Sequence, residues 1–112
     1  MIRKPWGSEE ILFECGQARV KLLRVKSGKR TSLQIHKQKR EVMMLLSGDA
    51  ILEHGTFLNY VMEPGHLHQI TTGVKHRLTG KSMGTSEAVI LEMAYGSDSD
   101  IVRIDDDFGR AS

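Results

Sequence analysis

Residues 28–48 read GKRTSLQIHKQKREVMMLLSG, and this stretch predicts two β-strands. The first, residues 31–37, alternates in polarity, so that Gln34 and His36 share one face of the strand. The second begins at Glu41 and continues as an apolar run. A hairpin between the two strands would bring the amide, the imidazole and the carboxylate together at one end of a barrel.

Glycine divides the rest of the chain into pieces of strand length. There are 11 glycines against 2 prolines, and the pieces between them are rich in Val, Ile and Leu without a helical period. The strands expected are residues 11–15, 18–25, 31–37, 41–47, 50–53, 56–62, 66–70, 74–78 and 87–95. Many short strands at close spacing predict an all-β protein, a sandwich or jelly-roll barrel. We expect a single domain, residues 1–112, with residues 97–112 as an acidic tail that lies on the barrel or forms a short helical turn.

Length and composition exclude several classes of protein. A chain of 112 residues with 39% hydrophobic and 27% charged residues suits one globular domain. The longest apolar run, residues 42–46, is far shorter than the roughly 20 residues that span a bilayer, so no membrane partner is expected. The start, MIRKPWGSEE, becomes acidic where a signal peptide needs an apolar stretch, and the single Cys15 suits a reducing compartment. We expect a cytoplasmic protein.

The net charge of +2 is unevenly distributed. Residues 97–112 hold five aspartates and two arginines, a net charge of −3, which leaves +5 on the first 96 residues. No long stripe of Lys and Arg follows the chain, so nucleic acid is not an expected partner. A mildly basic body favours a small anionic ligand.

A fourth donor joins the three of the opening stretch. His76 begins the strand that follows the turn at residues 73–75. Two imidazoles, a carboxylate and an amide oxygen form a mixed set that suits a divalent transition metal with open coordination positions. A single histidine in a strand is more often an ordinary half-buried residue than a ligand, so the residues alone indicate a β-barrel with a candidate metal site.

Four blocks of sequence resemble one known family. GKRTSLQIHKQKREVMMLLSG resembles the first cupin motif, and TTGVKHRL, residues 71–78, resembles the second. With KPWGSEE at residues 4–10 and DSDIVRIDDDFGR at residues 98–110, the order and spacing are similar to the cupin domain of type II mannose-6-phosphate isomerases. That domain also occurs behind mannose-1-phosphate guanylyltransferase domains. The resemblance implies a single cupin β-barrel.

The resemblance also implies a ligand set for the metal. Carried over by position, the family's ligands are Gln34, His36, Glu41 and His76, and the cofactor is a divalent transition metal such as Zn, Mn, Fe, Co or Ni. Three positions depart from the family's usual pattern: Thr71 stands where proline is usual, Lys39 where arginine is, and Met43 where an aromatic residue is. The asparagine that often follows the last histidine is absent as well.

The implied activity is the aldose–ketose isomerisation of mannose 6-phosphate or a related sugar phosphate. Arg30, placed by alternation on the face of Gln34, and Arg110, near the end of the chain, are the candidates for binding the phosphate. The catalytic residues stay unknown, because a metal-bound hydroxide, Glu53 and Lys75 are equal candidates for the base. The alternative is a non-catalytic cupin that binds a sugar or a metal. Guanylyl transfer by this chain is excluded, because no glycine-rich nucleotide-binding loop is present.

One rival motif deserves comparison. His66 and His68 are also one residue apart, as in the first motif, but no glutamate follows at the expected distance. The pair lies where the family has no ligand, and we do not expect it to bind a metal.

Alternation also predicts an apolar outer surface. If the candidate ligands face inward, then Leu33, Ile35, Val42 and Met44 face outward. The Trp6 segment would cover part of this surface, and a second copy of the chain would cover more. We expect a homodimer with these four residues at an apolar interface.

Overall fold

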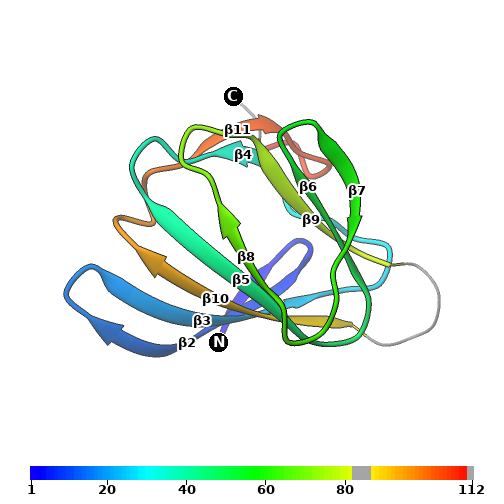
Figure 1. Ribbon diagram of the computed structural model, residues 1–112, viewed down its shortest axis with the longest axis horizontal. Coiled ribbons are helices and arrows are strands. Elements are labelled where there is room, and N and C mark those ends of the chain that lie inside the picture. The colour runs from blue at the N-terminus through cyan, green and yellow to red at the C-terminus, as the bar shows by residue number, and fades with distance from the viewer. Residues whose placement is uncertain (82–86, 111–112) are drawn as a thin grey trace.

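The computed structural model describes residues 1–81 and 87–110, and these residues form strands, turns and loops without a helix. Figure 1 shows the strands wrapped into two facing sheets. In chain order they are β1 (Ile2–Lys4), β2 (Gly7–Cys15), β3 (Ala18–Val25), β4 (Leu33–Ile35), β5 (Arg40–Ser47), β6 (Ala50–His54), β7 (Phe57–Val61), β8 (Leu67–Ile70), β9 (His76–Gly80), β10 (Ala88–Tyr95) and β11 (Val102–Asp105). No helix long and apolar enough to cross a membrane occurs in the described ranges.

All strand pairs are antiparallel, and the two sheets enclose the core. The first sheet has the order β1-β2-β3-β10-β5-β8, and the second has the order β11-β4-β9-β6-β7. Apolar side chains from both sheets are buried between them, among them Leu23, Leu45, Leu52, Leu78 and Ile90. The predicted all-β class is confirmed.

The expected hairpin between β4 and β5 is wrong, because the two strands belong to different sheets. β5 pairs along its length with β10, an apolar strand that takes the neighbouring position. β4 pairs with β9 and with β11, and residues 36–39 carry the chain from one sheet to the other. Side chains from β4 and β5 therefore meet across the interior instead of side by side.

Both ends of the chain contribute strands that the pattern did not predict. Residues 102–105 form β11 in place of the expected tail or helical turn. β2 begins at Gly7 instead of residue 11, and it pairs with β1. A Cβ at Gly7 would lie 1.7 Å from the Arg24 carbonyl oxygen, so only glycine allows β2 to approach β3 this closely. Trp6 is buried in the core, not on the outer surface as expected.

The outer face of the six-stranded sheet carries two apolar rows. Strand register places Leu22, Leu91, Met44 and Leu67 in one row, and Phe13, Val20, Met93 and Val42 in the next. These side chains are half-buried or exposed. Leu33 and Ile35 lie on the other sheet, so the expected interface of four residues is divided between two outer faces. Only Val42 and Met44 belong to the two rows.

We propose that a second copy of the chain covers these two rows, because a sheet face in contact with water is usually polar, whereas here polar register partners, Glu10 and Gln69, stand only at the ends of the rows. Light scattering at micromolar concentration should report twice the chain mass of 12.6 kDa. Met93→Glu should give a monomer, whereas the matched control Leu33→Glu, on the other sheet, should leave the dimer intact. A wild-type protein of single chain mass would contradict the proposal.

Candidate metal centre and substrate cavity

A cavity of about 230 Å³ lies between the two sheets. All four predicted metal ligands line it: Gln34, His36, Glu41 and His76. They come from β4, the connection after it, β5 and β9. The structure thus brings the four residues to one cavity, although their strands belong to two sheets.

Three of these residues form a compact buried group. Glu41 Oε1 lies 2.7 Å from His36 Nε2 and 3.3 Å from His76 Nε2. The three side chains are 3% exposed or less. One donor atom from each residue lies within 4.8 Å of the others. This spacing is that of donors around one ion.

The hydrogen bonds of the two Nδ1 atoms fix how the rings of His36 and His76 are turned, with Nε2 toward Glu41. His36 Nδ1 lies 2.6 Å from the Asp100 carbonyl oxygen, and His76 Nδ1 lies 3.2 Å from that of Val74. A carbonyl oxygen only accepts, so each Nδ1 donates a proton, and a ring that is neutral in this tautomer turns its Nε2 lone pair toward Glu41. Two lone pairs and a carboxylate then face one another.

This arrangement leaves three buried acceptors without a donor. His36 Nε2, His76 Nε2 and Glu41 Oε1 have no hydrogen-bond partner. Buried polar atoms are nearly always paired, and a cation at their centre would pair all three. Two imidazole nitrogens and one carboxylate oxygen suit a divalent transition metal. The residues present fit the metal that the sequence predicted.

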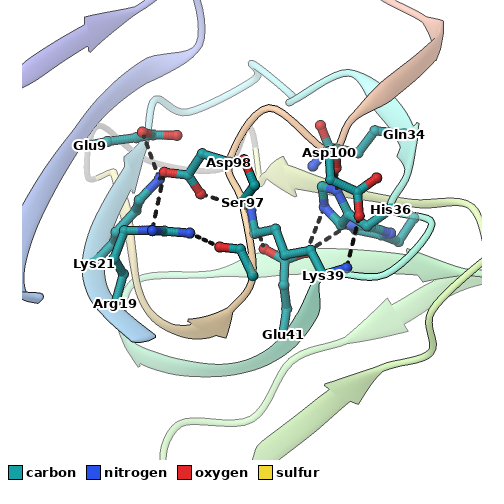
Figure 2. Close-up of polar contacts among 12 residues, drawn as sticks. Glu9, Arg19, Lys21, Gln34, His36, Lys39, Glu41, Ser97, Asp98 and Asp100 are labelled. Atoms are coloured by element: carbon teal, nitrogen blue, oxygen red, sulfur yellow. Dashed lines mark hydrogen bonds and ion pairs between the residues drawn. The ribbon is translucent and has the colours of Figure 1, made fainter. Parts of the chain in front are cut away.

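Gln34 lies beside this group. Its Cα is the register partner of His76, and its Oε1 accepts a hydrogen bond from Ser32 Oγ at 3.0 Å. Figure 2 shows its side chain close to His36. The amide oxygen therefore lies in the cavity wall, and its role as the fourth ligand stays a prediction.

Asp100 positions His36 from the connection between β10 and β11. Its carboxylate accepts hydrogen bonds from the backbone N–H groups of Lys37, Gln38 and Lys39 at 2.9, 2.7 and 2.8 Å (Figure 2). These donors lower the pKa of Asp100 to about 2. Its own carbonyl accepts the His36 Nδ1 proton. From the sequence, Asp100 was counted only as part of the acidic charge. Its place in the DSDIVR block, which resembles the family, was the available signal for a structural role.

Charged side chains continue the cavity wall next to the metal group. Lys39 is buried, and its Nζ lies 3.5 Å from Glu41 Oε2. Burial alone would lower the pKa of Lys39, but the carboxylates of Glu41, Glu92 and Asp98 outweigh it and raise that pKa. Lys39 therefore stays charged inside the protein.

Lys21 and Glu92 are neighbours on paired strands and were missed from the sequence. Both are buried and line the cavity. Burial raises the pKa of Glu92 well above its ordinary value, and the negative charge of Glu41 raises it further. Glu92 is the one charged residue of the otherwise apolar β10, and that was an available signal, whereas Lys21 shares β3 with Arg19 and Arg24.

The two predicted phosphate-binding arginines lie at different places. Arg110 lines the cavity, with Nε 2.7 Å from Asp106 Oδ2. Arg30 does not line it, and its guanidinium binds Asp107 at 2.6 and 2.8 Å. The alternation that placed Arg30 fails because residues 31–32 are outside any strand and both line the cavity.

Neither side chain considered as the base lines the cavity. Glu53 is the register partner of Arg77 and lies on the outer side of the sheet, and Lys75 is exposed. The rival histidines also lie elsewhere: His66 pairs with Glu63 at 3.4 Å, and the ring of His68 stacks edge-on against Tyr60. Among the described residues, the cluster of donors with metal-like spacing is that of His36, Glu41 and His76.

Comparison with known proteins gives matches over nearly the whole chain. The family model described as mannose-6-phosphate isomerase C-terminal matches residues 1–106. The xanthan biosynthesis protein XanB of Xanthomonas campestris pv. campestris is 32% identical over 97% of this chain. The chain spans 23% of the length of that relative.

Solved structures share the fold at low identity. CapF, a capsular polysaccharide assembling protein from Staphylococcus aureus, superposes with a TM-score of 0.75 at 15% identity, over 92% of this chain and 33% of its own. Rru_A2000 from Rhodospirillum rubrum, described as a cupin-2 domain, superposes with a TM-score of 0.68 at 17% identity, over 82% of this chain and 66% of its own. The predicted cupin fold is confirmed.

Proposed function

The chain belongs to the family of mannose-6-phosphate isomerase C-terminal domains, and from this premise we propose that it is a metal-dependent aldose–ketose isomerase for a sugar phosphate of the mannose 6-phosphate type. The observation that carries the proposal is the group of three buried, unpartnered acceptors in the cavity wall. A structural role alone gives no reason to bury a carboxylate against two lone pairs.

In the proposed isomerase, different residues of the cavity bind the metal and position its ligands. His36, Glu41 and His76, with Gln34, would hold the metal, which supplies a Lewis acid for the sugar oxygens. Asp100 and Val74 hold the two rings in the tautomer that leaves Nε2 free.

The remainder of the cavity suits a small anion. Lys21, Lys39, Arg103 and Arg110 line it, and they would attract the phosphate. Its volume of about 230 Å³ is below the range of drug-sized pockets, about 300–1,000 Å³, which favours a compact polar ligand.

A specific observation favours a second function, a non-catalytic sugar- or metal-binding module. The chain spans only 23% of XanB, so the homologous region there is one part of a larger protein. The two functions differ in turnover and agree in metal binding.

The test is to follow mannose 6-phosphate by NMR in the presence of the metal-loaded protein. We expect fructose 6-phosphate to appear, and chelation or His76→Ala to stop the reaction. Binding of mannose 6-phosphate without interconversion of any hexose or pentose phosphate would contradict the isomerase and favour the module. His66→Ala, which removes an exposed imidazole outside the cavity, is the matched control for the variant.

A further inference from the structure

Three cations surround one carboxylate at the edge of the cavity. Asp98, in the connection between β10 and β11, receives Lys21 Nζ at 2.7 Å on one oxygen and Lys39 Nζ at 3.1 Å on the other. Arg19 Nε lies 3.3 Å from the first of these oxygens. Figure 2 shows the three side chains pointing toward Asp98 from two separate segments. We call Arg19, Lys21 and Lys39 the anion site.

The cations are fixed and buried, whereas the carboxylate is not. The side chains of Lys21 and Lys39 are each 6% exposed and that of Arg19 is 11% exposed, but that of Asp98 is 41% exposed. Buried cations require a negatively charged partner, and here that partner, the Asp98 carboxylate, is exposed to solvent. An anion from solution can therefore approach the place that Asp98 occupies.

The connection that carries Asp98 is anchored on both sides of it. Gly96 N donates to the Gln17 carbonyl at 3.0 Å, and Asp100 accepts three backbone N–H groups. Rotation of the Asp98 side chain would vacate the anion site without moving the Asp100 carbonyl that holds His36. The carboxylate can leave while the metal group stays in place.

Lys39 links the anion site to the metal group of His36, Glu41 and His76. Lys39 Nζ contacts Asp98 at 3.1 Å and Glu41 Oε2 at 3.5 Å. A compact ligand could thus place an anionic end in the anion site and its other end at the metal group. Glu9 also contacts Lys21, at 3.4 Å, and would remain beside the bound anion.

We propose that the anion site binds the phosphate of a phosphomonoester, and that Asp98 closes the site as a competing internal anion when no phosphate is present. A phosphomonoester carries a charge of about −1.5 to −2 and three acceptor oxygens, so it satisfies three cations better than one carboxylate does. The proposal rests on the proposed function for the identity of the ligand as a sugar phosphate. It makes Asp98 a determinant of affinity and not a ligand of the substrate.

Calorimetric titration of the full chain with inorganic phosphate, with mannose 6-phosphate and with mannose tests the proposal. Asp98→Asn should raise the affinity for both phosphates at least about tenfold and leave mannose unchanged, because only the competing charge is removed. Lys21→Met should lower both phosphate affinities at least about tenfold. Asp107→Asn, which removes a carboxylate that binds Arg30 outside the cavity, is the matched control and should change nothing.

Equal phosphate affinity in the wild type and in Asp98→Asn would overturn the proposal. If that variant does not fold, Lys21→Met against the wild type decides, and unchanged phosphate binding would overturn it. Because the titration needs no turnover, these outcomes are separate from the isomerase test. A protein that isomerises mannose 6-phosphate with the same KM in the wild type, Asp98→Asn and Lys21→Met would keep the proposed function and refute this site.

Discussion

Replacing His36 or His76 with alanine is expected to lower the affinity for divalent transition metal at least about 100-fold, because changes that only reorient a ligand already cost about 10–100-fold. Each substitution removes one of two imidazole nitrogens that lie 2.7 and 3.3 Å from Glu41 Oε1. Titration of metal-free protein with Zn²⁺ or Mn²⁺ against a competing chelator measures the loss.

The control for this prediction is His66→Ala, which removes an exposed imidazole that lies beside Glu63. We expect its metal affinity to equal that of the wild type. Far-ultraviolet circular dichroism shows whether each variant keeps its strands. A folded His36→Ala and a folded His76→Ala that both bind metal as the wild type does would refute the assignment.

Metal binding is also expected to raise the free energy of unfolding by about 4 kcal/mol when free metal exceeds its Kd about 1,000-fold. The reason is that the unfolded chain does not hold the three donors within 4.8 Å of one another. For a domain of this size the change corresponds to a rise in Tm of at least about 10 °C. Thermal unfolding with and without chelator measures it.

The same experiment on His76→Ala should show a much smaller rise in Tm on adding metal, because a 100-fold loss of affinity leaves only about 1.4 kcal/mol of stabilisation at the same metal concentration. A wild-type Tm that is the same with metal and with chelator would show that the three acceptors do not bind the ion. A rise of equal size in the variant would place the ion elsewhere.

The alternation of residues predicted which side chains line the site, but it did not predict which strands pair with one another. Gln34 and His36 share the inward face because both belong to one short extended segment, and Glu41 lies near the start of the next strand, one residue after Arg40. The pairing partner of a strand cannot be predicted in this way. Nothing in residues 31–47 indicates that β5 pairs with β10 and β8 while β4 joins the other sheet, because the pairing of β5 with β10 depends on a segment about 50 residues later.

The failures have local physical causes. Arg30 was placed in the cavity by counting alternate residues through 31–32, where the chain is not a strand. The acidic end of the chain looked like a surface tail, but Asp98 and Asp100 bind buried or backbone groups and β11 completes the second sheet. Lys21 was not predicted as a cavity residue. Alternation alone does not distinguish a buried lysine from a solvated one, because the difference depends on acidic partners that only the structure shows.

X-ray absorption spectroscopy of the metal-loaded wild type identifies the atoms bound to the ion. We predict a first shell of nitrogen and oxygen that includes two imidazoles, and one imidazole in His76→Ala at the higher metal concentration that its lower affinity requires. A shell without imidazole, or one that His76→Ala leaves unchanged, would contradict a metal centre built on His36, Glu41 and His76.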